Sequence, residues 1–438
     1  MFLLVSLLSC DDKDTASVPE LTDTVSVTDS ASTTDTALTT DTAPEGPCIP
    51  PGGATVDYTV LPEPAVTLPA AGDSFVDPTF GTTIIRVTDA AEAGGPSTHG
   101  YSYWPVFNSD STLFFLNKAG TPTLYSLDPE SGATSELGPL FPSGVSCGWE
   151  DAAWSRTDPH LMYCHDLAPK RLYTWDVRAK DASGLTLLHD FDGELSGPSD
   201  RYLWQMLADK SDEVFTLHTR DDSGTGRTVI VYERSTDTVH LRDYGGRGLD
   251  ETHVDHGGDR IVVLLRGLWE VWDFRADTIV TVEQTEEQRG GLCHQAAGTN
   301  RYVGGDCWET GFLSRPLDDP HNITHLVSTL QADGVTEDWT HSTHLSLNQW
   351  DERYFVASMA TGDDGEWSPW EQEIVAVSIH GDWVVRLAHH HSDWEAGGYY
   401  AEPRVSMSYD GRYAAFTSNF DGLGQDVYLL KMPLICEE

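Results

Sequence analysis

The sequence predicts an all-β fold, a β-propeller of seven blades that follows a disordered N-terminal tether. Three observations support this prediction. Short aromatic-rich strands alternate with Asp, Gly, Asn and Pro turns, a similar unit recurs about every 50 residues, and no long segment has helical periodicity. Because three or four short strands cannot bury both faces of their sheet, the units must pack against one another. The repeats are degenerate, so six or eight blades are alternatives.

The N-terminus is typical of an exported, lipid-anchored protein. Residues 1–10 are an apolar run ending in Leu7-Leu8-Ser9-Cys10, which resembles the lipobox of bacterial lipoproteins, where the cysteine is lipidated. The run is too short to span a bilayer, and an accidental hydrophobic start is the alternative. Residues 11–46 are rich in Thr, Ser, Asp and Ala, which predicts a disordered linker before a propeller domain at 47–438. We therefore expect a protein of the bacterial cell envelope that contacts the membrane through its anchor only.

The charge balance bears on the partners of this domain. Asp and Glu number 70 against 26 Lys and Arg, for a net charge of −44. Nucleic acids need a basic surface, so we expect no nucleic-acid partner. A strongly solvated surface is the simple interpretation of the excess, and bound divalent cations are the alternative.

The cysteines other than Cys10 predict disulfides. Six remain, an even number in a chain expected to be exported: Cys48, Cys147, Cys164, Cys293, Cys307 and Cys436. Their spacing favours two local loops, Cys147–Cys164 and Cys293–Cys307, and a Cys48–Cys436 bond joining the two ends of the domain. Free buried cysteines are the alternative, and the lack of a C-x-x-C pair disfavours zinc.

The repeats can be followed along the chain. The units are Tyr101–Leu137, Glu150–Val177, Asp200–Tyr244, Glu251–Val282, His294–Leu317, Thr343–Ala388 and Tyr399–Met432. In the last unit, Tyr409-Asp410-Gly411 predicts a tight turn between a first strand and the buried strand at 412–418. A separate strand at Thr82–Thr88 is expected to complete the last blade and close the ring.

Sequence segments of the first and last units resemble those of a known propeller family. FVDPTFGTTIIRVTD and HGYSYWPVFNSD in the first unit, and EPRVSMSYDGRYAAFTSNFDG in the last, resemble propellers of the oligogalacturonate-lyase type and, more distantly, the TolB propeller. In the lyase family a manganese ion is held by His and Gln side chains beside the bound acidic sugar. The resemblance implies His294-Gln295, His344 and the run His389-His390-His391 as candidates for such ligands here.

The first strands of the units should bring distant residues together. They begin near residues that lie between 41 and 58 positions apart: His99, Asp151, Trp204, His253, His294, His344 and Glu402. We expect His253, His294 and His344 to meet at one end of the central channel, with Gln295 and Asp255 nearby. Three imidazoles with such companions suit one divalent transition metal of manganese type.

A uronic-acid lyase needs three further roles at this site. For β-elimination, Arg404 could pair with the carboxylate, His99 or His391 could take the C5 proton, and Tyr101 or Tyr399 could protonate the leaving oxygen. The alternatives are structural. Each histidine could cap a neighbouring blade, Arg404 could pair with Glu402, and the run 389–391 could be an exposed loop.

Two functions therefore follow from the sequence. The first is binding and metal-assisted cleavage of a uronic-acid-type oligosaccharide. The second is a non-catalytic surface propeller that binds a glycan, a peptide or an envelope protein, because propellers serve many unrelated functions. In both cases we expect a monomer with its ligand at the propeller face.

Overall fold

The computed structural model describes residues 56–433, apart from 146, 151, 286–291, 307–310, 329–342, 360–366, 394–396, 421 and 423. The chain divides into two units, Met1–Glu45 and Gly46–Glu438, and the fold described here belongs to the second. The predicted signal segment, the linker, Cys10, Cys48, Cys307 and Cys436 lie outside the described residues. Within the described part of the chain, no helix is long and apolar enough to cross a membrane.

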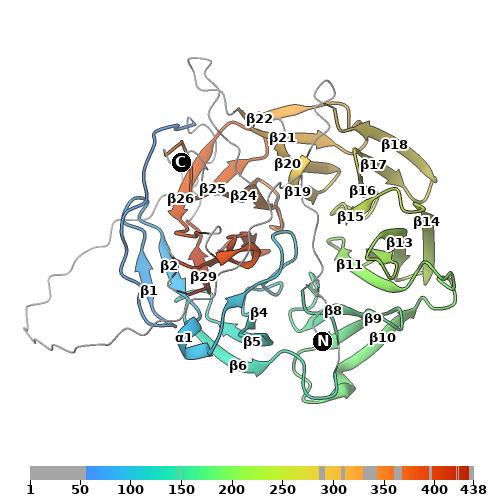
Figure 1. Ribbon diagram of the computed structural model, residues 1–438, viewed down its shortest axis with the longest axis horizontal. Helices are drawn as coiled ribbons and strands as arrows, with labels where there is room; N and C mark the ends of the chain where they lie inside the picture. The colour runs from blue at the N-terminus through green and yellow to red at the C-terminus, as the bar shows by residue number, and fades with distance from the viewer. Residues whose placement is uncertain are drawn as a thin grey trace, which may run out of the picture. The chain divides into compact units, whose positions relative to one another are not determined.

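The fold is an all-β propeller, as predicted, with antiparallel sheets set around a centre (Figure 1). Four sheets have four strands each, running from the centre outward in chain order. They are β3 (Ser97–Thr98), β4 (Leu113–Lys118), β5 (Thr121–Leu127), β6 (Thr134–Pro139); β7 (Ala153–Trp154), β8 (Leu161–Asp166), β9 (Arg171–Asp176), β10 (Leu185–Asp190); β19 (Leu292–Gly298), β20 (Arg301–Asp306), β21 (Gly311–Pro316), β22 (Thr324–Ser328); and β23 (Thr343–Ser346), β24 (Tyr354–Met359), β25 (Glu373–Ser378), β26 (Val384–His389).

The fifth sheet joins the two ends of the domain. It contains β1 (Ser74–Val76), β2 (Thr83–Arg86), β29 (Asp426–Lys431), β28 (Tyr413–Ser418) and β27 (Ser406–Met407), in that order. The expected closure by the strand at Thr82–Thr88 is confirmed, because β2 pairs with β29. All six residues of β28 are buried, and Gly411 in the preceding turn has a φ of 71°, which glycine adopts without strain.

The sixth sheet has eight strands and corrects the predicted count. It contains β11 (Tyr202–Ala208), β12 (Val214–Arg220), β13 (Gly226–Glu233), β14 (Thr238–Asp243), β15 (Leu249–Val254), β16 (Ile261–Leu265), β17 (Leu268–Asp273) and β18 (Thr278–Glu283). The prediction of seven separate blades is therefore wrong: the described residues form five separate blades and this eight-stranded sheet. A single residue pair, Gly226 and Leu249, joins its two halves. A Cβ atom at position 226 would collide with Leu249, so glycine permits the junction.

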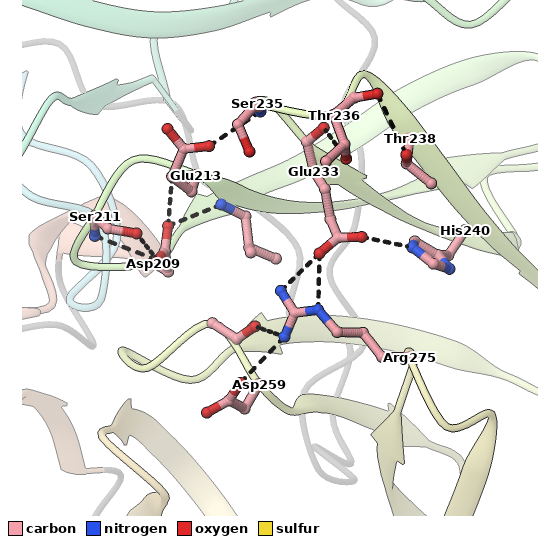
Figure 2. Close-up of polar contacts among 12 residues, drawn as sticks. Asp209, Ser211, Glu213, Glu233, Ser235, Thr236, Thr238, His240, Asp259 and Arg275 are labelled. Atoms are coloured by element: carbon pink, nitrogen blue, oxygen red, sulfur yellow. Dashed lines mark hydrogen bonds and ion pairs between the residues drawn. The ribbon is translucent and has the colours of Figure 1, made fainter.

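An ion-pair network also links the two halves (Figure 2). Arg275, which follows β17, donates to Glu233 of β13 at 2.8 Å and to the carbonyl oxygen of Gly258 at 3.0 Å. His240 of β14 bonds the other carboxylate oxygen of Glu233 at 3.0 Å. These contacts fix the turn before β16 against the outer strands of the neighbouring half.

The core lies between adjacent sheets, and helical structure is minor. The apolar clusters combine residues of neighbouring sheets, as where Ile85, Phe107, Tyr125 and Leu429 pack together. The helical segments are α1 (Ala90–Ala93) and the 3-10 turns η1 (Ala182–Gly184) and η2 (Tyr399–Ala401). The innermost strands are thus held from both sides, which makes their ends a rigid base for side chains that face the centre.

Candidate functional site

The axial mouth is a cluster of polar and aromatic side chains that lie on or beside β3, β15, β19, β23 and β27, which belong to five sheets. We define it by His99, Tyr101, Tyr103, Glu251, His253, His294, Gln295, His344, Glu402 and Arg404. The rings of His294 on β19 and His344 on β23 lie 4.2 Å apart between centroids. The ring of Tyr101, from the segment after β3, lies 4.9 Å from His344 and 4.8 Å from Tyr103. The expected meeting of residues distant in sequence is therefore found for these side chains.

Glu251 of β15 organises one side of the axial mouth. It accepts hydrogen bonds from Tyr103 Oη at 2.9 Å, His253 Nε2 at 3.0 Å and Gln295 Nε2 at 2.7 Å. Burial alone would raise the pKa of Glu251, but the bonds from His253 and Tyr103 outweigh it and the pKa lies below its usual value. Glu251 is therefore an ionised carboxylate inside a shell of donors.

A β-bulge aims two consecutive side chains into the axial mouth. The register of β19 against β20 shifts between Cys293 and Gln295, and His294 has a φ of 61°. In a regular strand neighbouring side chains point to opposite faces, whereas here His294 meets His344 and Gln295 meets Glu251. Arg404 also has a positive φ, of 43°. Such strained conformations in non-glycine residues are concentrated at functional sites.

Arg404 lies on the other side of the axial mouth, just before β27. Its side chain is fully buried, and Nη2 donates to Thr98 Oγ1 at 2.6 Å, whereas Nε and Nη1 form no hydrogen bond. The guanidinium lies 5.0 Å and 5.3 Å from the ring centroids of Tyr399 and Tyr400 on η2. Glu402 Oε2 lies 3.5 Å from His344 Nε2.

Two histidines of the axial mouth, His99 and His344, are held neutral. Burial, followed by the charge of Arg404, lowers the pKa of His99 to about 3. Its Nε2 lies 3.3 Å from the carbonyl oxygen of Pro403 and must donate there, which leaves an unpartnered lone pair on buried Nδ1. Burial, with His294 and Arg404 nearby, also lowers the pKa of His344 well below its usual value. Burial raises the pKa of Tyr101, so this phenol stays protonated.

The predicted metal ligands do not fit a metal site as they are arranged. His253 and Gln295 both turn toward Glu251, while His294 and His344 face each other. Among the residues that the structure describes, no group of three or more His, Cys, Asp or Glu side chains is placed to hold a metal ion. The expected companion Asp255 instead holds a turn, accepting from the backbone N–H of Asp259 and Arg260 at 2.7 and 2.8 Å.

His391 lies outside the axial mouth, contrary to expectation. Its Nδ1 is 3.2 Å from Glu63 Oε2, and its ring stacks on Phe420 at 4.6 Å. The run His389-His390-His391 is not an exposed loop either, because all three side chains are buried. The sequence could not show this, since the segment that covers them lies more than 300 positions earlier in the chain.

A small cavity lies behind the axial mouth. About 30 Å³ is open to water-sized molecules, between Tyr103 and His253 at one end and Arg156, His256 and Asn348 at the other. This is room for about two water molecules. A molecule larger than water does not fit into this cavity.

The described cysteines bear out one predicted disulfide. Cys147 and Cys164 form a bond, with Cα atoms 5.7 Å apart. The position of the Cys293 side chain is not described, and its expected partner Cys307 and the Cys48–Cys436 pair are outside the described residues.

Two residues of the axial mouth were missed from the sequence, Glu251 and Tyr103. Both stand beside residues that were singled out, Glu251 two positions before His253 and Tyr103 two positions after Tyr101. Spacing of two along a strand puts the side chains of Glu251 and His253 on one face of β15, and this signal could have found Glu251.

Comparisons with known proteins support the fold. No family model matches the chain, and no curated protein matches it either. Among solved structures, an oligogalacturonate lyase of Vibrio parahaemolyticus superposes with a TM-score of 0.56 and 13% identity, covering 83% of this chain and 98% of the lyase. A structure of the mitotic checkpoint complex gives a TM-score of 0.47 at 11% identity, over 86% of this chain and 99% of that one. The chain thus has a β-propeller similar to that of an oligogalacturonate lyase.

Proposed function

We propose that this protein binds a uronic-acid-type oligosaccharide at the axial mouth, with Arg404 pairing a uronate carboxylate. The observation that carries the proposal is the buried guanidinium whose Nε and Nη1 have no hydrogen-bond partner. A planar guanidinium matches a carboxylate in charge and geometry, and a buried donor without an acceptor is unfavourable until one arrives. The similarity to an oligogalacturonate lyase supports an acidic sugar as that acceptor.

The surrounding residues suit a sugar ring. Tyr399 and Tyr400 cover Arg404, and Tyr400 is 46% exposed. Aromatic faces provide apolar contact for a sugar, while its hydroxyls need polar partners such as Glu402 and Gln295 Oε1, which has no hydrogen-bond partner. Because Arg404 is covered, we expect the rings on η2 to move when the ligand enters.

The binding test uses calorimetry with a trigalacturonate and its methyl ester. The acid should bind and the ester, which lacks the charge, should bind at least tenfold more weakly. Arg404→Met should weaken binding of the acid about 10- to 100-fold, the range for hydrogen bonds to charged groups. Arg412→Met removes the same charge from an exposed turn of the same sheet and should change little. Equal binding of acid and ester, or an unaffected Arg404→Met variant, would refute the proposal.

Cleavage by β-elimination is a second candidate, favoured by the lone pair on His99 Nδ1, by the protonated phenol of Tyr101 in the same axial mouth and by the fold similarity. In this scheme Arg404 neutralises the carboxylate, His99 takes the C5 proton and Tyr101 supplies a proton to the leaving oxygen. The low pKa of His99 makes it a weak base, so we expect slow turnover. Incubation with trigalacturonate should generate the unsaturated product, which absorbs in the ultraviolet. Binding without product would identify a non-catalytic propeller, and product only with added Mn²⁺ would contradict the arrangement described above.

We also propose that the chain is exported, anchored through a lipid on Cys10 and held at the bacterial cell envelope. The Cys147–Cys164 bond supports this, since structural disulfides persist in oxidising compartments. Incorporation of labelled palmitate that is abolished by Cys10→Ala would test the anchor. Full labelling of that variant would contradict it.

A further inference from the structure

Residues 56–66, here called the strap, lie as an extended segment against β26, the outermost strand of the sheet β23–β26 (Figure 1). The outermost strands of other blades, such as β6 and β10, have several exposed residues. In β26 all six residues are buried, including Arg386 and His389. The strap covers this edge together with Asp77 and Phe80, which contact His389.

The sheet holds the strap through side-chain donors at every second residue. Trp370 Nε1 donates to the carbonyl oxygen of Asp57 at 2.6 Å, and Arg386 Nη1 donates to that of Thr59 at 2.6 Å. His389 Nε2 lies 2.8 Å from the carbonyl oxygen of Leu61, and His391 Nδ1 lies 3.2 Å from Glu63 Oε2. The carbonyl oxygens of residues 57, 59 and 61 therefore form one regular row of acceptors, and the carboxylate of Glu63 lies beyond its end.

Apolar contacts accompany this row. The ring of Tyr58 stacks on Trp370 with centroids 5.3 Å apart and planes inclined by 12°. Val56 and Tyr58 pack on the core cluster that contains Trp370, while Val66 packs on the next cluster along the edge. The two ends of the strap thus pack on two different core clusters.

The strap is not a strand of the sheet. In the described part of the chain, no backbone hydrogen bond joins it to β26. Pro62 and Pro64 lack the N–H that a strand ladder requires, and they favour an extended polyproline-type backbone whose carbonyls point outward. Proline-rich peptides with this backbone commonly bind in grooves that are lined by aromatic side chains.

We propose that the row Trp370, Arg386, His389 and His391 is a binding groove for an extended, proline-containing segment, and that the strap occupies it as a detachable ligand. This inference is independent of the function proposed for the axial mouth. It means that the groove can bind the same peptide when it is supplied as a separate molecule.

The test uses the full chain and a fluorescent peptide with the sequence of residues 56–66. The variant Tyr58→Ala/Glu63→Gln weakens the strap and leaves the groove intact. We expect this variant to bind the peptide, and the wild-type protein to bind it at least tenfold more weakly, because the tethered strap competes at an effective concentration of about millimolar. Adding Trp370→Phe, which removes the Nε1 donor, should weaken peptide binding about 3- to 10-fold.

The controls separate recognition from a structural role. A peptide of the same composition in scrambled order should not bind, and thermal unfolding of the strap variant should remain cooperative. Failure of the folded strap variant to bind the peptide would overturn the proposal. Loss of the folded state of this variant would also overturn the proposal, because the strap would then be an integral part of the fold. Equal binding of the scrambled peptide would overturn it as well.

Discussion

Glu352 Oε1 lies 2.6 Å from His256 Nδ1, and this contact joins the turn before β24 to the turn after β15. Lys210, from the turn between β11 and β12, contacts the same carboxylate oxygen, and the backbone N–H of Thr299 donates to the other oxygen at 2.8 Å. Arg156 Nη2 lies 3.0 Å from His256 Nε2 and extends the network to a further sheet. The end of the channel opposite the axial mouth is thus closed by charged residues from several sheets.

Glu352→Gln should lower the free energy of unfolding by about 3 kcal/mol. The carboxylate of Glu352 is mostly buried, and its removal leaves the ammonium group of Lys210 without an opposite charge. Urea unfolding followed by tryptophan fluorescence measures this. The matched control is Glu136→Gln, which breaks the more exposed pair with Lys118 and should cost less than about 1 kcal/mol. Equal losses in the two variants would contradict a special role for the network.

His256→Gln should reduce the sensitivity of the protein to acid. Burial, followed by the charge of Arg156, lowers the pKa of His256 to about 3, so between pH 6.5 and 3 the unfolded chain binds more protons at this residue than the folded one. Stability at this site is therefore lost as the pH falls below about 6.5. From pH 7 to pH 5 the wild type should lose about 2 kcal/mol more than the variant, as measured by urea unfolding at both pH values. An identical loss would show that His256 does not titrate in this way.

Glu251→Gln should destabilise the axial mouth. The carboxylate accepts three hydrogen bonds, and an amide would offer one acceptor oxygen and place an NH₂ group against another donor. We expect a loss of about 1–3 kcal/mol in thermal unfolding, the range for a buried group left unsatisfied. Glu130→Gln, on an exposed turn, is the control and should change little. An unchanged melting temperature in Glu251→Gln would show that the three donors find other partners.

Removal of the disulfide by Cys147→Ser/Cys164→Ser should lower the free energy of unfolding by about 3 kcal/mol, because the bond closes a loop over a separation of 17 residues. A reducing agent should lower the stability of the wild type by about this amount more than that of the variant, in which only the other predicted disulfides remain to be reduced. A reducing agent that destabilises both proteins equally would point to a second bond.

The repeat spacing was enough to predict the propeller, because each turn residue and each short apolar strand is set locally. It also predicted that β2 would close the last sheet. The spacing could not predict the eight-stranded sheet, which depends on the close approach of Gly226 and Leu249 in the folded ring.

The site was predicted less completely than the fold, for a physical reason. His253 is one residue from the end of β15, whereas His294 is four residues from the end of β19, so the three aligned histidines are not at the same depth. The bulge at His294 shifts the register by one residue and reverses which side chains face the mouth. His391 was misplaced because burial by the strap is a long-range contact.

The pairing of β2 with β29 has a consequence for the order in which the protein folds during its synthesis. Arg86 and Asp426, which bond at 2.8 Å across this seam, are 340 residues apart. During synthesis β2 emerges early and can pair with β1 on one edge, but its other edge has no partner until β29 has been made. The ring therefore closes only after β29 has been made, and folding waits for a contact of very long sequence separation, which is slow. Until then the unpaired edge of β2 is open to wrong partners.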